Sequence, residues 1–188
     1  LRRRFAGLAP AEVHHHGVRK ALFDAAVNTP YDPEGGPNAV FVGAAHLDRD
    51  FIRRAARLCP GWTFHVIGPL TDVPRAPNVA VHGEMPFERT VPYIRHADAG
   101  LHTLEYTPGA EAFTDSLKVL QYAYCRLPIV APEFIRSPRP NVCAYRGGDD
   151  ESIRRAMERA RAFDRSAVAR ERVLAEDDLA AALAGPLW

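Results

Sequence analysis

Short apolar runs alternate with segments of helical spacing between residues 38 and 145. The runs are shorter than a typical helix, and the first three are each followed or ended by a glycine. This pattern is typical of strands that are buried on both faces of a sheet. The expected strands are residues 39–42, 63–67, 78–82, 97–102, 128–131 and 141–145.

The segments between these strands predict helices. Residues 47–58 place Phe51 and Ala55 on one face, and a Pro-Gly pair ends the segment. In the next segment Pro86 stands near the first turn, where proline is well tolerated. Further helices are expected at residues 86–96, at 114–124 and, as one or two helices, within 149–183.

Strands that alternate with helices indicate parallel β-α-β units. We therefore expect an α/β fold: a doubly wound, mainly parallel, six-stranded Rossmann-like sheet with helices on both faces. Such folds bind ligands at the carboxyl ends of their strands, where the strand order reverses. The loops that can hold a ligand are then residues 43–46, 83–87 and 103–116.

The chain divides into a lead-in and one domain. Residues 1–37 combine an arginine cluster, a histidine run and a Pro/Gly-rich stretch, and are expected to be an irregular interdomain junction. Residues 38–188 are expected to form a Rossmann-like domain with C-terminal helices. Because the sequence begins with Leu1, we expect the chain to be a piece of a longer protein.

Composition excludes several classes of protein. The 188 residues carry a net charge of +1, which argues against a nucleic-acid partner. No apolar run is long enough to span a membrane. Adjacent histidines do not converge on one ion, so the run at 14–16 predicts no metal site. The three separated cysteines, Cys59, Cys125 and Cys143, predict neither a disulfide framework nor a zinc site.

Residues 115–122 (DSLKVLQY) carry the strongest candidate site. Asp115 or Ser116 can cap the helix, and Lys118 adds a positive charge to a helix end that already favours anions, which suits a pyrophosphate. Gln121 shares the face of Lys118 and can reach a sugar or ribose hydroxyl. An ordinary amphipathic helix with a solvated lysine explains this spacing equally well. The residues expected to pack on the sheet are Leu117, Leu120 and Tyr124.

Other candidates carry weaker signals. The small residues after Val42 allow a ligand to approach the backbone, although a tight turn needs them too. Glu84 can accept hydrogen bonds from ribose, or can simply stand at a helix N-terminus. His65, within a strand, is expected to be a core histidine. His102 ends the fourth strand and is a candidate for reaching the site.

Several motifs together resemble the C-terminal half of GT-B glycosyltransferases. The first, VHHHGV with Phe23 following, resembles the junction through which the chain enters that domain. The order of the motifs, with GEMPFE and SLKVLQY, is most similar to GumK-type glucuronosyltransferases of exopolysaccharide synthesis. The motifs stand at residues 13–18, 40–43, 64–68, 79–86, 96–101, 116–122 and 127–132.

The resemblance implies that the domain binds a UDP-sugar, with UDP-glucuronate as the expected donor. By this resemblance Gly43 and Ala44 line the donor cleft, and Glu84 and Met85 lie beside the nucleotide. Tyr106 contacts the sugar or a phosphate. The diphosphate is held by Ser116 and Lys118, and the ribose by Gln121.

The resemblance also implies a mechanism. Gln121 replaces the glutamate common in retaining enzymes, which favours inversion. The catalytic base is expected in an N-terminal acceptor domain outside this chain, with no metal or other cofactor. The acceptor is expected to be a saccharide, lipid-linked at the inner membrane, and the enzyme is expected to be cytoplasmic.

Two alternative functions stay open. They are a UDP-sugar epimerase of the same fold and a non-catalytic nucleotide-binding or regulatory module. A phosphoacceptor receiver is disfavoured, since only Asp48 and Asp50 stand near its acidic pair.

Overall fold

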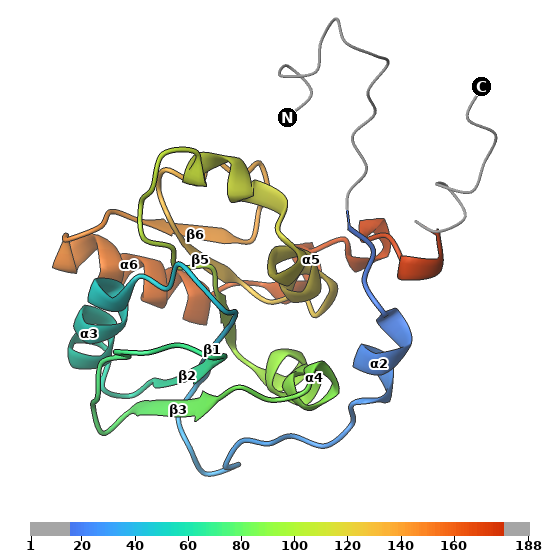
Figure 1. Cartoon of the computed structure of the whole chain (residues 1–188), viewed down its shortest axis with the longest axis horizontal. Helices are drawn as coiled ribbons and strands as arrows, with labels where there is room; N and C mark the ends of the chain where they lie inside the picture. The colour runs from blue at the N-terminus through green and yellow to red at the C-terminus, as the bar shows by residue number, and fades with distance from the viewer. Residues whose placement is uncertain (1–15, 179–188) are drawn as a thin grey trace, which may run out of the picture.

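A single six-stranded sheet forms the centre of the computed structural model, which describes residues 16–178 (Figure 1). The strand order is β3-β2-β1-β4-β5-β6, and every neighbouring pair is parallel. All six expected strands are present. They are β1 (Asn38–Val42), β2 (Thr63–Ile67), β3 (Val79–Gly83), β4 (Ala99–Leu101), β5 (Ile129–Pro132) and β6 (Val142–Tyr145).

Helices cover both faces of this sheet, which confirms the doubly wound α/β fold (Figure 1). On one face lie α3 (Arg49–Leu58) and α6 (Asp150–Arg161). The other face is covered by α2 (Lys20–Ala25), α4 (Phe87–His96) and α5 (Leu117–Tyr124). The short 3-10 helices are η1 (Ala110–Asp115), η2 (Arg165–Ala167) and η3 (Arg170–Arg172).

Three boundaries differ from the sequence-based expectation. The helix expected at 114–124 begins at Leu117, because the residues before it form η1, in which Phe113 leaves helical geometry. The expected irregular lead-in contains α2, whose Phe23 is fully buried. α6 ends at Arg161, and the 3-10 turns η2 and η3 follow before residues 176–178 return to helical geometry. The remaining expectations, for residues 1–15 and 179–188, lie outside the described residues.

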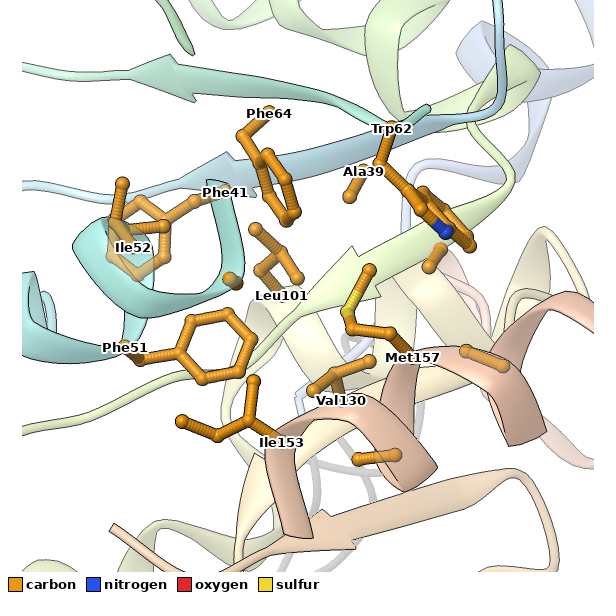
Figure 2. Close-up of a cluster of buried hydrophobic side chains, with 14 of the residues drawn as sticks. Ala39, Phe41, Phe51, Ile52, Trp62, Phe64, Leu101, Val130, Ile153 and Met157 are labelled. Carbon is orange, nitrogen blue, oxygen red and sulfur yellow. The ribbon is translucent and has the colours of Figure 1, made fainter. Parts of the chain in front are cut away.

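The core beneath α3 and α6 is rich in aromatic side chains. Figure 2 shows Phe41 of β1, Phe64 of β2 and Phe51 of α3 meeting around Leu101 of β4, with Met157 of α6 closing the cluster. All five are at most 1% exposed. Because alternate residues of a strand point to opposite faces, Val40 packs in the core on the other side of the sheet.

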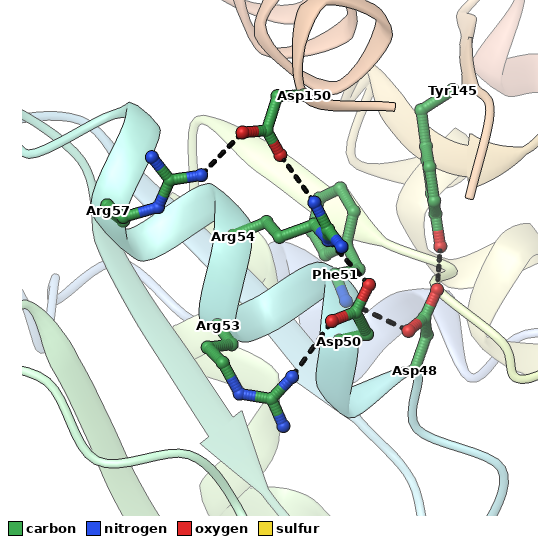
Figure 3. Close-up of polar contacts among 8 residues, drawn as sticks. All are labelled: Asp48, Asp50, Phe51, Arg53, Arg54, Arg57, Tyr145 and Asp150. Atoms are coloured by element: carbon green, nitrogen blue, oxygen red, sulfur yellow. Dashed lines mark hydrogen bonds and ion pairs between the residues drawn. The ribbon is translucent and has the colours of Figure 1, made fainter. Parts of the chain in front are cut away.

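A polar network joins α3 to α6 and β6 (Figure 3). Asp48 caps α3 by accepting from the Phe51 N–H at 2.9 Å, and it also accepts from the Tyr145 hydroxyl at 2.8 Å. Arg54 lies between Asp50 and Asp150, at 2.6 and 2.8 Å. Asp48 and Asp50, which stand closest to the acidic pair of a phosphoacceptor receiver, therefore serve helix capping and ion pairing. This agrees with the prediction that disfavours a receiver domain.

On the α5 face, Tyr122 lies directly over Gly100 in the middle of β4. A Cβ built on Gly100 would overlap the Tyr122 ring, so only glycine lets α5 approach this closely. The Tyr122 hydroxyl donates to the Val40 carbonyl at 3.0 Å and so ties α5 to β1 as well. Both ends of this buried side chain therefore hold α5 in one position over the sheet.

We expect Gly100→Ala to destabilise the fold by about 3 kcal/mol, the scale of overpacking a core. Gly147→Ala is the matched control, since nothing lies within 4 Å of a Cβ built there, and it should change stability by less than about 0.5 kcal/mol. Urea unfolding measures both. Equal stabilities for the two variants would contradict the packing of Tyr122 on Gly100.

Candidate functional site

The sheet has its topological switch point between β1 and β4. From β1 the chain moves outward to β2 and β3, and from β4 it moves the opposite way to β5 and β6. The loops after β1 and β4 therefore diverge, and this is where doubly wound sheets bind ligands. Gly43 follows β1 and His102 follows β4, so both stand at this point.

Lys118 reaches over the carboxyl end of β1. It lies four residues before Tyr122 and therefore shares the inner face of α5. Its Nζ is 4.0 Å from the centre of the Phe41 ring. A Cβ built on Gly43 would lie 3.3 Å from this Nζ and 3.1 Å from the ring, so the missing side chain of Gly43 leaves room for the ammonium group.

The charge of Lys118 is not neutralised. Within residues 16–178 its ammonium forms no ion pair or hydrogen bond, and the face of Phe41 is its main electrostatic contact. Burial lowers the pKa of Lys118 from 10.5 to about 7, because a cation loses hydration there without gaining an anion. A bound anion would remove this cost, so the site is electrostatically incomplete when empty.

Three buried polar atoms in the segments that follow β4 and precede α5 also lack hydrogen-bond partners. Among the described residues, no hydrogen-bond partner exists for His102 Nδ1, Thr103 Oγ1 or Ser116 Oγ. Such atoms are rare in folded proteins. Two of them follow β4 and the third precedes α5, so they flank the switch point together with Lys118. This combination of one cation and three open hydrogen-bonding atoms fits a polar, anionic ligand.

The predicted diphosphate residues are brought to one end of α5. Ser116 occupies the position before the helix, and Lys118 lies in its first turn beside Gly43. Gln121 follows one turn later and is 5% exposed. Ala44 is exposed in the loop after β1. The structure thus gathers Gly43, Ser116 and Lys118, and the contacts of each with a donor remain predictions.

Glu84 and Met85 lie farther along the same edge. The Gly43 N–H donates to Ile67 at 3.0 Å and the Gly68 N–H donates to Gly83 at 2.8 Å, so hydrogen bonds link the ends of β1, β2 and β3. Two strand spacings, about 10 Å, separate β3 from β1. Met85 packs against the core, and Glu84 is exposed. Only an extended ligand can contact both Glu84 and Lys118.

Tyr106 lies in a separate hollow. It is 64% exposed, and its ring meets that of Phe134 edge-on with centroids 5.3 Å apart. Together with Glu111 and Arg136 these rings line a cavity of about 490 Å³. Lys118 does not line this cavity, and the contact of Tyr106 with the sugar or phosphate stays a prediction.

Two local expectations for α5 were wrong. Leu117 is 42% exposed, because the helix begins there and turns Val119, Leu120 and Tyr122 toward the sheet instead. Leu120 and Tyr124 are buried as expected. Ser116 stands at the N-cap position, but its hydroxyl makes no capping bond.

Asp115 is engaged by an arginine from the loop after β5. Its Oδ1 accepts from two nitrogens of Arg139 at 2.9 and 2.6 Å. This ion pair links the turn before α5 to the neighbouring loop. It also keeps the Asp115 carboxylate occupied close to the helix end at which an anion would bind.

The two histidines behave as expected. His65 is a satisfied core residue, since its ring nitrogens lie 3.0 Å from Asn38 and 3.0 Å from His82. His102, at 1% exposure, does reach the switch point. Phe41 and Thr103 were missed, because a phenylalanine inside an apolar run and a threonine after it carry no signal that distinguishes them from ordinary core residues.

Residues 16–178 contain neither a cluster of metal-binding side chains nor a membrane-spanning helix. No group of three or more His, Cys, Asp and Glu side chains is placed to hold a metal ion. None of the helices there has the length and apolar character needed to cross a bilayer.

One curated protein is similar over most of this sequence. The chain is 35% identical over 151 residues to the UDP-glucuronate:glycolipid 2-beta-glucuronosyltransferase of Xanthomonas campestris pv. campestris. The alignment covers 77% of this chain and 36% of that protein, so the chain spans about a third of its relative. No family model matches the sequence.

Solved structures share the fold. Sucrose-phosphate synthase from Thermosynechococcus elongatus superposes with a TM-score of 0.65 at 17% identity, over 97% of this chain and 53% of that one. AviGT4, a glycosyltransferase involved in Avilamycin A biosynthesis, gives 0.61 at 20% identity, over 97% and 58%. Anabaena HepE, in complex with UDP and glucose, gives 0.59 at 12% identity, over 90% and 55%.

The chain has the fold of a GT-B C-terminal domain. The resemblance seen in the motifs is thereby confirmed at the level of fold. The chain covers between 53% and 58% of these three structures. The strand ends that bear Gly43 and His102, and the helix α5 that bears Lys118, belong to this domain of GT-B fold.

We expect the Lys118 ammonium of the GT-B domain to titrate near pH 7. The sequence has only two lysines, Lys20 and Lys118, so side-chain NMR signals can be assigned with Lys118→Met. Since the unfolded chain binds more protons than the folded one between about pH 7 and 10.5, wild type should gain stability relative to Lys118→Met as the pH rises through that window. A titration midpoint above pH 10 would contradict the partly buried position of an ammonium without an ion pair.

Proposed function

We propose that this chain is the donor-binding domain of a glycosyltransferase and that Lys118 binds the diphosphate of a UDP-sugar. The observation that carries the proposal is the partly buried Lys118 in the first turn of α5, whose ammonium has no ion pair or hydrogen bond within residues 16–178 and lies at the switch point of the sheet. Backbone N–H groups at a helix N-terminus favour the same anion. The named activity of the Xanthomonas relative and the UDP bound to HepE support this choice of ligand.

The expected reaction is transfer of glucuronate from UDP to a saccharide, lipid-linked at the inner membrane, with inversion. An acceptor hydroxyl attacks the anomeric carbon, the bond from that carbon to the UDP oxygen breaks, and a base from another domain takes the hydroxyl proton. Lys118 stabilises the negative charge that develops on the departing UDP, so no metal is needed for that role. Gly43 and Ala44 line the cleft, Ser116 assists at the diphosphate, and Gln121 faces the ribose.

The rest of the proposed donor site extends along the strand ends. Glu84 and Met85 lie beside the nucleotide, and Tyr106 contacts the sugar or a phosphate. A UDP-sugar is long enough to leave the switch point in both directions. We place the enzyme in the cytoplasm, working at the inner membrane on its acceptor.

Calorimetric titration with UDP tests the proposal. We expect wild type to bind UDP and Lys118→Met to bind it about 10- to 100-fold more weakly, as for loss of a charge-assisted contact of about 1.5–3 kcal/mol. Lys20→Met, at the only other lysine, is the matched control and should bind within about twofold of wild type. UDP-glucuronate should bind more tightly than UDP-glucose.

Each outcome of this titration has one meaning. Absence of UDP binding by wild type at millimolar concentration would contradict the proposal and favour a module without nucleotide affinity. Equal affinities for wild type and Lys118→Met would remove Lys118 from the site. Tighter binding of UDP-glucose would overturn glucuronate as the donor sugar.

UDP binding should also take up a proton. The anion raises the pKa of Lys118 from about 7 toward its ordinary value, so the affinity falls as the pH rises above 7. At pH 8, calorimetry in two buffers of different ionisation enthalpy should show uptake approaching one proton per UDP. Lys118→Met should show none, and equal uptake by both proteins would contradict the assignment.

A further inference from the structure

His102 connects the end of β4 to the turn that precedes α5. Its Nε2 lies 2.8 Å from the carbonyl oxygen of Phe113, in η1. A carbonyl oxygen only accepts hydrogen bonds, so Nε2 carries the proton and donates it. In the neutral ring, Nδ1 is then an unprotonated acceptor.

This acceptor has no donor. His102 is 1% exposed, and its Nδ1 is buried without a hydrogen-bond partner among the described residues. Burial above all, and then the nearby charge of Lys118, lower the pKa of His102 to about 4. The hydrogen bond to Phe113 raises this pKa but does not outweigh them, so the ring is neutral at pH 7. Near Lys118 the ring therefore carries an unpaired lone pair, and not a positive charge.

The chemistry of a partner for Nδ1 follows from that lone pair. Phosphate oxygens of a nucleotide diphosphate are acceptors at neutral pH and repel another acceptor. Lys118 is a donor, but a diphosphate would occupy it. The groups of a nucleotide-sugar that donate on either side of the diphosphate are hydroxyls, on the ribose and on the pyranose.

We propose that His102 is a specificity-determining residue that accepts a hydrogen bond at Nδ1 from a hydroxyl of the nucleotide-sugar, while its Nε2–H holds the turn before α5. This inference rests on the proposed function, because it needs the diphosphate at Lys118. It adds a residue that selects for a hydroxyl next to the anion site and that does not titrate in the neutral range.

Two variants separate the two ring nitrogens. In His102→Gln the amide nitrogen can take the place of Nε2 and keep the bond to Phe113, but no acceptor remains at the Nδ1 position. In His102→Asn the shorter amide can place its oxygen near the Nδ1 position, while the bond to Phe113 is lost. His102→Gln thus removes the acceptor that would recognise the ligand, and His102→Asn removes the hydrogen bond that positions the turn before α5.

The experiment measures the affinities of the whole chain, wild type and both variants, for UDP-glucuronate, UDP and 2′,3′-dideoxy-UDP, with urea unfolding alongside. We expect His102→Gln to keep wild-type stability and to bind a ligand that carries the recognised hydroxyl about tenfold more weakly. Its affinity for ligands that lack this hydroxyl should be unchanged. His102→Asn should be less stable but should keep the discrimination between ligands.

The three ligands identify the hydroxyl. A loss confined to UDP-glucuronate assigns a pyranose hydroxyl, and a loss shared by UDP but not by dideoxy-UDP assigns a ribose hydroxyl. An equal loss for all three ligands, or no loss for any, overturns the inference. Failure of wild type to bind UDP at all overturns the proposed function itself, and this result is distinct because it does not depend on the variants.

Discussion

The contact between Tyr122 and Gly100 is the constraint on which the site depends. The Tyr122 ring can lie on β4 only because position 100 has no side chain, and its hydroxyl then reaches the Val40 carbonyl on β1. These two contacts fix both the height and the rotation of α5 over the sheet. Since Lys118 stands four residues earlier on the same face, the packing of a buried tyrosine determines where a functional charge is placed.

In the described part of the chain, the site contains unpaired polar and charged groups, which lower the stability of the fold. Elsewhere the acids and arginines of α3 and α6 pair with one another, as Arg54 does with Asp50 and Asp150 (Figure 3). At the switch point, by contrast, the described residues give Lys118 an aromatic ring but no anion, and leave three buried polar atoms without partners. Unsatisfied groups of this kind destabilise a folded chain. Their concentration around one helix end therefore favours a ligand as the missing partner.

The fold was predictable because it depends on local pattern. Every strand followed from an apolar run, and α3, α4, α5 and α6 from spacing, since buried parallel strands and amphipathic helices leave a periodic signal. The short helix α2 was not predicted. Features that depend on contacts between residues distant in the sequence were less predictable. The start of α5 at Leu117 depends on η1, and the orphan Nδ1 of His102 depends on the Phe113 carbonyl eleven residues later. Lys118 could be found as a candidate from its place in a first turn, but the lack of any ion pair could not.

The choice of lysine at position 118 is itself informative. Lysine accounts for only two of the 24 basic residues, so arginine is the default cation of this chain. A guanidinium keeps its charge at any physiological pH and would carry the full penalty of burial whenever the site is empty. An ammonium group can release its proton when its pKa falls to about 7, and can recover it when an anion arrives. Lysine over Phe41 thus lets the empty domain tolerate a cation site that becomes fully charged only when its ligand binds.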